Sequence, residues 1–105
     1  MSYIEELQDV IKKLHNAVAR HLESVPVKET HKGQTVWEGV VEVFELIGHP
    51  QASKIYAWTH DSWHGEASSG SRTITVLNIH PIQSAHDAVR AVIVREFRAN
   101  AQSEA

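Results

Sequence analysis

The sequence has no cysteine, so disulfide bonds and thiolate metal sites are excluded and folding depends on the hydrophobic core. It also has no apolar run near the roughly 20 residues that a membrane-spanning helix needs. The opening residues SYIEELQDV lack the basic and apolar regions of a secretion signal. We therefore expect a cytoplasmic protein without a membrane partner.

The charge balance is slightly negative, at −3 for 105 residues with histidines neutral. A negative net charge repels polyanions, so nucleic acid is a disfavoured partner. The length fits one domain, which we place at residues 1–105 with a frayed tail over 98–105.

The first element is predicted to be a helix that begins at a capping box. Ser2 and Glu5 have the spacing at which each side chain binds the other residue's backbone amide. Apolar residues follow in steps of three and four, which is typical of one helical face: Ile4, Leu7, Ile11, Leu14 and Val18. The same seam continues to His21 and Val25, so we expect the helix to end there, because Pro26 disfavours the helical conformation in the residue before it.

Three β-strands are predicted next, over residues 35–47, 53–60 and 72–79. In the first strand, Val41 and Val43 alternate with Glu42, a pattern typical of one buried face. The loop between the first two strands is about five residues long, which favours a hairpin. Residues 26–34, before the strands, are predicted to be a polar connector.

The last element is predicted to be a helix, because Ser84 and Asp87 again have a capping spacing and apolar residues follow at helical intervals over 88–97. Three consecutive β-branched residues in AVIVREF leave a fourth strand as the alternative for 88–97.

The resulting fold is an α+β domain in which both helices cover one face of a three-stranded antiparallel sheet. The residues expected to form its core are Leu7, Leu14, Val41, Val43, Val76, Val89, Ile93 and Phe97.

This order of helix, three strands and helix resembles the topology of the double-stranded-RNA-binding domain. In that family the last helix begins with lysines that contact phosphate, whereas residues 83–87 here read QSAHD. The acidic Asp87 opposes phosphate. The resemblance therefore implies the fold only, and the RNA-binding activity of that family does not carry over with it.

The segment KIYAWTHDSWH, residues 54–64, holds three of the seven aromatic residues and two histidines. In a strand, Tyr56, Trp58 and His60 point to one face. If that face is open, it forms a binding surface made of Tyr56, Trp58, His60, Trp63 and Arg72. The alternative is that Tyr56 and Trp58 belong to the core.

A possible divalent-metal site is the HDxxH cluster formed by His60, Asp61 and His64, which supplies two imidazoles and a carboxylate. Further ligands would come from His80 and His86. The alternative is that these are exposed loop histidines. No motif indicates any other cofactor or identifies a small-molecule ligand.

Three functional hypotheses follow. The first is a small, non-catalytic interaction protein that forms a homodimer, because strand 35–47 has apolar residues on both of its faces and a second copy would cover the second face. The second is a nucleic-acid or nucleotide binder that stacks bases on Tyr56 and Trp58. The third is a metal-dependent enzyme centred on His60, Asp61 and His64.

Overall fold

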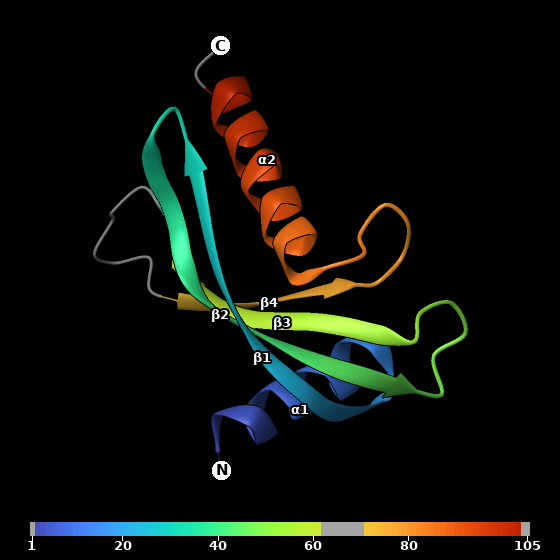
Figure 1. The fold of residues 1–105 in the computed structure, drawn as a ribbon. Helices are drawn as coiled ribbons and strands as arrows, with labels where there is room; N and C mark the ends of the chain where they lie inside the picture. Colours follow the sequence, from blue (N-terminus) through green and yellow to red (C-terminus); the bar gives the residue numbers. More distant parts are fainter. Residues whose placement is uncertain (1, 62–70, 104–105) are drawn as a thin grey trace.

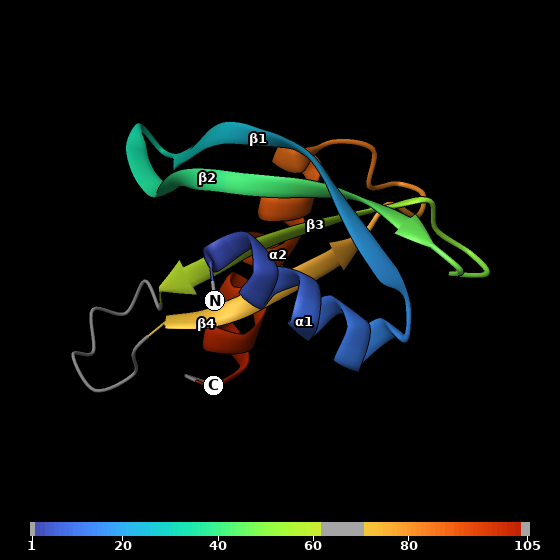
Figure 2. The same ribbon diagram turned by 90° about the horizontal axis from the view of Figure 1, so that it is seen from below.

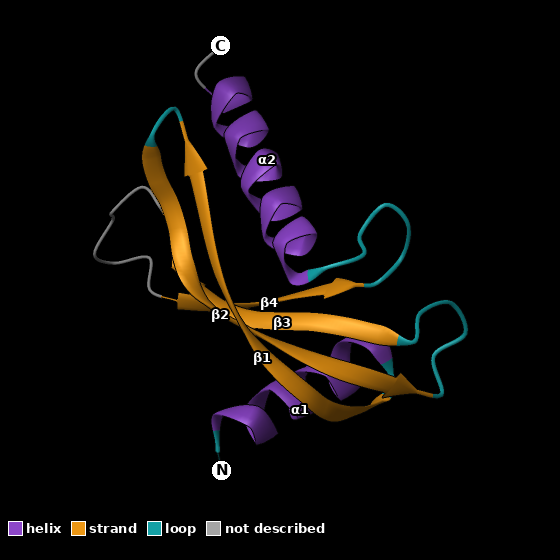
Figure 3. Cartoon of the chain, viewed as in Figure 1, coloured by secondary structure: helices purple, strands orange, loops and turns teal. Residues whose placement is uncertain are grey.

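The computed structural model describes residues 2–61 and 71–103. Its elements are α1 (Tyr3–His15), β1 (Val18–His31), β2 (Gln34–Ile47), β3 (Lys54–Asp61), β4 (Ser71–Leu77) and α2 (Ala85–Ser103) (Figure 3). The strands form one antiparallel sheet in the order β1-β2-β3-β4. Within the described residues, β1 and β4 are therefore its edges.

Helix α1 begins at the predicted capping box. The Ser2 hydroxyl accepts from the Glu5 amide at 3.2 Å, and the Glu5 carboxylate accepts from the Ser2 amide at 3.3 Å. The helix ends at Asn16, whose φ of 51° is left-handed and whose amide donates to the Lys12 carbonyl at 2.9 Å. The predicted continuation to Val25 is therefore wrong.

Residues 18–31 form a strand, so the sheet of the described residues has four strands and not the predicted three. The predicted connector over 26–34 is the end of β1 and a two-residue turn at Lys32 and Gly33, whose φ angles of 53° and 79° give a type I′ hairpin turn. Pro26 fits within β1 because an edge strand tolerates a missing backbone donor.

The two helices cover opposite faces of the sheet, which corrects the prediction that they share one face (Figures 1 and 2). The core beneath α1 contains Leu7, Ile11, Ala17, Ala19, Phe44, Leu46, Ala52, Ile55 and Ala57. The core beneath α2 contains Val27, Val41, Val43, Tyr56, Trp58, Ala85, Ala88, Val89, Val92 and Ile93. Successive strand residues point to opposite faces, so a strand that is apolar at both parities is buried on both sides. The arrangement also differs from the topology of the double-stranded-RNA-binding domain.

The predicted core is confirmed for Leu7, Val41, Val43, Val89 and Ile93, which are all buried. Val76 is half-buried and packs against the α2 core. Leu14 is 63% exposed, so its assignment to the core is wrong. It continues the seam of Leu7 and Ile11, but the seam is covered only as far as Ile11. The side chain of Phe97 lies outside the described residues.

Helix α2 forms as predicted, and residues 88–97 are helical. The Ser84 hydroxyl accepts from the Asp87 amide at 3.1 Å, and the Asp87 carboxylate accepts from the Gln83 amide at 3.1 Å. The helix extends to Ser103, within the predicted tail. In the part of the chain that the structure describes, neither helix is long and apolar enough to cross a membrane.

Candidate functional site

The aromatic residues of β3 do not form an open surface. Tyr56 and Trp58 point to the same face, as predicted, but α2 covers that face and leaves them 3% and 0% exposed. The Trp58 ring centre lies 6.1 Å from that of Trp37, and the Tyr56 hydroxyl accepts from the Asn78 amide group at 2.7 Å. The alternative prediction, that Tyr56 and Trp58 are core residues, is confirmed.

The remaining residues of the predicted surface lie at the other end of β3 and beyond it. His60 and Asp61 end β3, and their backbone partners on β4 are Arg72 and Ser71. The structure places these backbones but does not describe the side chains of His60, Asp61 and Arg72. Trp63 and His64 lie outside the described residues. The HDxxH metal site therefore stays a prediction.

One of the two further metal ligands that we expected, His80, does not lie beside this cluster. His60 pairs with Arg72 at the start of β4, whereas His80 follows the far end of that strand, which is about 20 Å long. His86 lies in the first turn of α2, with its Nδ1 atom 4.0 Å from Glu29. Among the described residues, no group of three or more His, Asp or Glu side chains is arranged to hold a metal ion.

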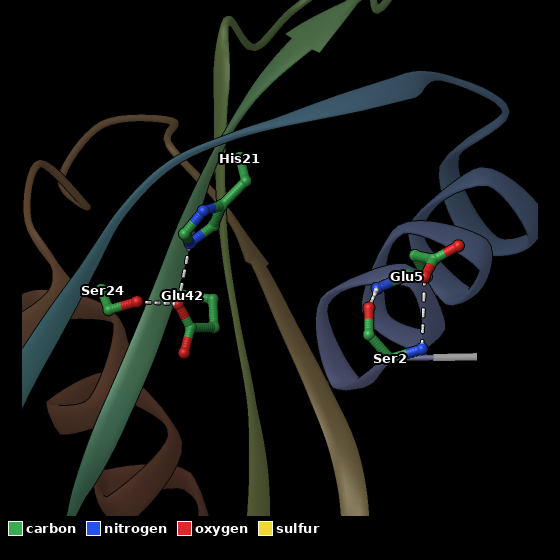
Figure 4. Close-up of polar contacts among 5 residues, drawn as sticks. All are labelled: Ser2, Glu5, His21, Ser24 and Glu42. Atoms are coloured by element: carbon green, nitrogen blue, oxygen red, sulfur yellow. Dashed lines mark hydrogen bonds and ion pairs between the residues drawn. The ribbon is translucent and has the colours of Figure 1, made fainter.

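A polar cluster that the sequence did not indicate joins His21 and Ser24 of β1 to Glu42 of β2 (Figure 4). Residues three apart on a regular strand face opposite sides. The register of β1 against β2 shifts between His21 and Glu23, and this bulge returns Ser24 to the face of His21. Both side chains thereby reach the same carboxylate.

The cluster satisfies a buried charge. The Glu42 side chain is 9% exposed, and its Oε1 atom accepts from His21 Nε2 at 2.9 Å and from the Ser24 hydroxyl. Since a carboxylate only accepts, Nε2 of His21 carries a proton. The His21 ring also lies edge-on to Phe44, with ring centres 5.4 Å apart. In a nucleophile relay the imidazole stands between serine and acid, whereas here both donors bind one oxygen, so the geometry stabilises Glu42.

A groove with a volume of about 410 Å³ runs along β4, at an edge of the sheet. Five consecutive strand residues, 73–77, form its floor. His15 at the end of α1 stands on one side, and Val92 and Arg95 of α2 stand on the other. The groove thus gives access to the edge of the sheet between the two helices.

The backbone of β4 leaves hydrogen-bonding groups facing this groove. The Asn78 amide donates to the Lys54 carbonyl at 3.0 Å, which fixes the residues whose backbone groups face β3. Because these groups alternate along an antiparallel strand, those of Thr73, Thr75 and Leu77 face away from β3. In the described part of the chain no strand pairs with this side of β4.

His15 joins α1 to the same strand. Its Nε2 atom lies 3.0 Å from the Thr75 hydroxyl, and its ring centre lies 6.4 Å from that of His49. Burial lowers the pKa of His15 below its ordinary value, and the charge of His49 lowers it further. His15, which lines the groove, is therefore neutral at pH 7.

Comparison of the chain with protein-family models, with curated proteins and with solved structures finds no significant match. Its function is therefore argued from its own geometry.

Proposed function

We propose that this protein is a small interaction protein that self-associates through the edge of β4, where two copies pair their sheets. The observation that supports the proposal is the row of outward-facing backbone groups at Thr73 and Thr75 in an accessible groove. An edge strand of this kind is a template for pairing with another strand. Charges or prolines that would block such pairing are missing from residues 73–77, which read TITVL.

The sequence of β4 fits pairing with its own copy. An antiparallel pair centred on Thr75 places Thr73 opposite Leu77 and Ile74 opposite Val76. Residues that lie directly opposite share a face of the sheet, and these pairs have matching parity. None of the five side chains is charged, so no like charges meet. A two-fold axis needs only this one self-complementary strand.

An exposed apolar residue beside the groove also favours a second copy. Leu14 is 63% exposed although it is apolar, and its neighbour His15 binds Thr75 of the edge strand. A two-fold axis perpendicular to the sheet keeps α1 of both copies on the same side. Pairing at β4 would then bring the two last turns of α1 toward each other and cover Leu14. The proposed dimer interface is therefore the β4 edge and not the sheet face of Tyr56 and Trp58, because α2 already covers that face.

Sedimentation velocity of the purified chain at micromolar concentration tests the proposal. We expect a dimer for the unmodified protein and for Thr75→Ala, which retains the backbone N–H. Thr75→Pro removes that N–H from the outward side and should give a monomer. Both variants lose the contact with His15, so their difference isolates the backbone donor.

Two outcomes contradict the proposal. A mass of one chain for the unmodified protein would exclude self-association. A Thr75→Pro variant that folds and stays dimeric would exclude the β4 edge as the interface. Both variants are expected to fold, because the N–H of residue 75 faces away from β3 and its loss leaves the β3–β4 hydrogen bonds intact. Circular dichroism checks that they do.

A further inference from the structure

His15 lies at the centre of the proposed β4 interface. Its Nε2 atom is 3.0 Å from the hydroxyl of Thr75, the residue on which the pair of β4 strands is centred. Thr75 lies opposite Ala57, a member of the core beneath α1, so its side chain is on the α1 face of the sheet. Across a two-fold axis the two Thr75 side chains would have Cβ atoms about 5 Å apart. Each His15 ring would therefore lie next to the axis.

The titratable and charged groups that the structure places around His15 are basic. The ring centre of His49, in the loop after β2, is 6.4 Å from that of His15. Arg95 of α2 lines the groove on its other side. Lys12 and Lys13 precede His15 in the last turn of α1. No acidic side chain is among the described residues that line the groove, so no carboxylate there would compensate a proton on His15.

The orientation of His49 excludes it as an acceptor for a protonated His15. Nδ1 of His49 accepts from the backbone amides of Gln51 and Ala52, at 3.1 Å and 3.0 Å. In a neutral imidazole the other ring nitrogen then carries the proton and acts as a donor. His49 therefore has no ring nitrogen left to accept a hydrogen bond from His15.

We propose that pH regulates the self-association of this protein through His15, so that the dimer is stable at neutral and alkaline pH and dissociates in mild acid. This inference rests on the proposed β4 interface. In the single chain His15 is half-buried and lines an open groove. Pairing at β4 would close the groove and exclude its water, which disfavours a charged imidazole more than a neutral one.

The two-fold symmetry strengthens this effect. Both His15 rings lie beside one axis, so protonation of the two copies would place like charges together in the interface. Partial burial already lowers the pKa of His15 in the single chain, and His49 lowers it further. Association acts in the same direction because it increases the burial. The dipole of α1 favours a cation at its last turn, but it is present in both states and leaves their difference unchanged.

The sign of the pH dependence follows from this order of pKa values. The dimer binds the proton more weakly than the single chain, so dissociation takes up protons. The dimer dissociation constant should therefore be constant above the pKa of His15 in the single chain, which lies below 6.5, and should rise as the pH falls through that pKa.

Sedimentation velocity of the unmodified chain at about pH 8, 6.5 and 5 and at constant ionic strength tests the proposal. We expect the dissociation constant to change little between the first two values and to rise about tenfold or more at the third. His15→Gln keeps a hydrogen-bonding side chain that cannot be protonated, so it should lose most of this rise. His31→Gln is the matched control, because His31 is exposed at the end of β1, the opposite edge of the sheet, and should keep the full rise. Circular dichroism at each pH checks folding.

The outcomes separate this regulation from the interface itself. A mass of one chain at about pH 8 would overturn the proposed self-association and this inference with it. A dimer whose dissociation constant does not rise in acid, or rises equally in the unmodified chain and in His15→Gln, would overturn regulation by His15 and leave the β4 interface in place. If His15→Gln does not fold, dilution calorimetry of the unmodified dimer at about pH 6, in two buffers of different ionisation enthalpy, decides. It should show proton uptake on dissociation, and no uptake would overturn the inference.

Discussion

His15 and Thr75 join the last turn of α1 to the edge strand of the sheet, with the imidazole Nε2 3.0 Å from the threonine hydroxyl. The two residues are 60 positions apart in the chain, so the contact exists only in the folded protein. It places a titratable group at the groove along β4. The partial burial of His15 makes its proton affinity depend on folding.

The first prediction is that His15 lowers stability in mild acid. Its pKa is lowered on folding from the ordinary value of 6.5, chiefly by burial and secondarily by His49. The unfolded chain therefore binds the proton more tightly, so the stability associated with neutral His15 is fully present above about pH 6.5 and is lost as the pH falls through the folded pKa. Urea unfolding from about pH 8 to about pH 5 should show a shallower decline for His15→Gln than for the unmodified protein.

The comparison at about pH 8 is the control for this experiment, because His15 is neutral there in both the folded and the unfolded chain. It removes the constant effect of losing the Thr75 contact. Parallel pH profiles for the two proteins would show that His15 does not contribute.

The second prediction separates two leucines of one helical seam. Leu7 is 1% exposed and Leu14 is 63% exposed. Leu7→Ala should lower the free energy of unfolding by about 2 to 5 kcal/mol, because it creates a cavity in the core beneath α1. Leu14→Ala should change it by no more than about 0.5 kcal/mol at concentrations where the chain is monomeric. Equal losses in chemical denaturation would mean that α1 packs differently.

The third prediction concerns the buried carboxylate of Glu42. Glu42→Gln keeps the shape of the side chain but replaces an ionised acceptor of two hydrogen bonds with a neutral amide. It should lower the free energy of unfolding by about 1 to 3 kcal/mol. The matched variant Glu45→Gln, on the same strand but in an exposed pair with Arg20, should cost at most about 1 kcal/mol. A smaller loss for Glu42→Gln than for Glu45→Gln would show that the cluster with His21 and Ser24 adds no stability.

The fourth prediction is a stabilising change in the β1–β2 turn. Lys32 has a φ of 53°, which is unfavourable for most residues but is adopted readily by asparagine. Lys32→Asn should raise the free energy of unfolding by about 0.5 kcal/mol or more. Gly33→Ala, at a φ of 79°, should lower it. Thermal unfolding of the two variants should show opposite shifts, and a lower midpoint for Lys32→Asn would contradict the type I′ turn.

The outer parts of the fold could be predicted because their signals are local. Ser2 with Glu5 and Ser84 with Asp87 cap their own helices, and both caps are present. The structure of the segment from Val18 to Val25 could not be predicted in this way, because its apolar residues fit one face of a helix as well as they fit a strand. Helix α1 ends before this segment because Asn16 adopts the left-handed conformation. Asparagine adopts this conformation readily, but its presence in a sequence does not require it.

The candidate sites depend on contacts that no local pattern contains. The bulge in β1 brings Ser24 to the side of His21, and regular alternation would have separated them. Glu29 resembles any surface glutamate in the sequence, since its burial depends on α2, more than 50 residues later. The sequence of β2 shows apolar residues on both faces, but this pattern does not indicate whether a helix of the same chain or a second copy covers the second face.

The position of α2 after all four described strands has a consequence for synthesis on the ribosome. Helix α1 and the four strands emerge first, and α1 can cover its own face of the sheet as soon as β2 and β3 form. The other face, with Tyr56 and Trp58, stays without a cover until residues 85–103 have left the ribosome. Nascent chains therefore pass through a stage in which a large aromatic surface is exposed to solvent, and chaperones recognise surfaces of this kind.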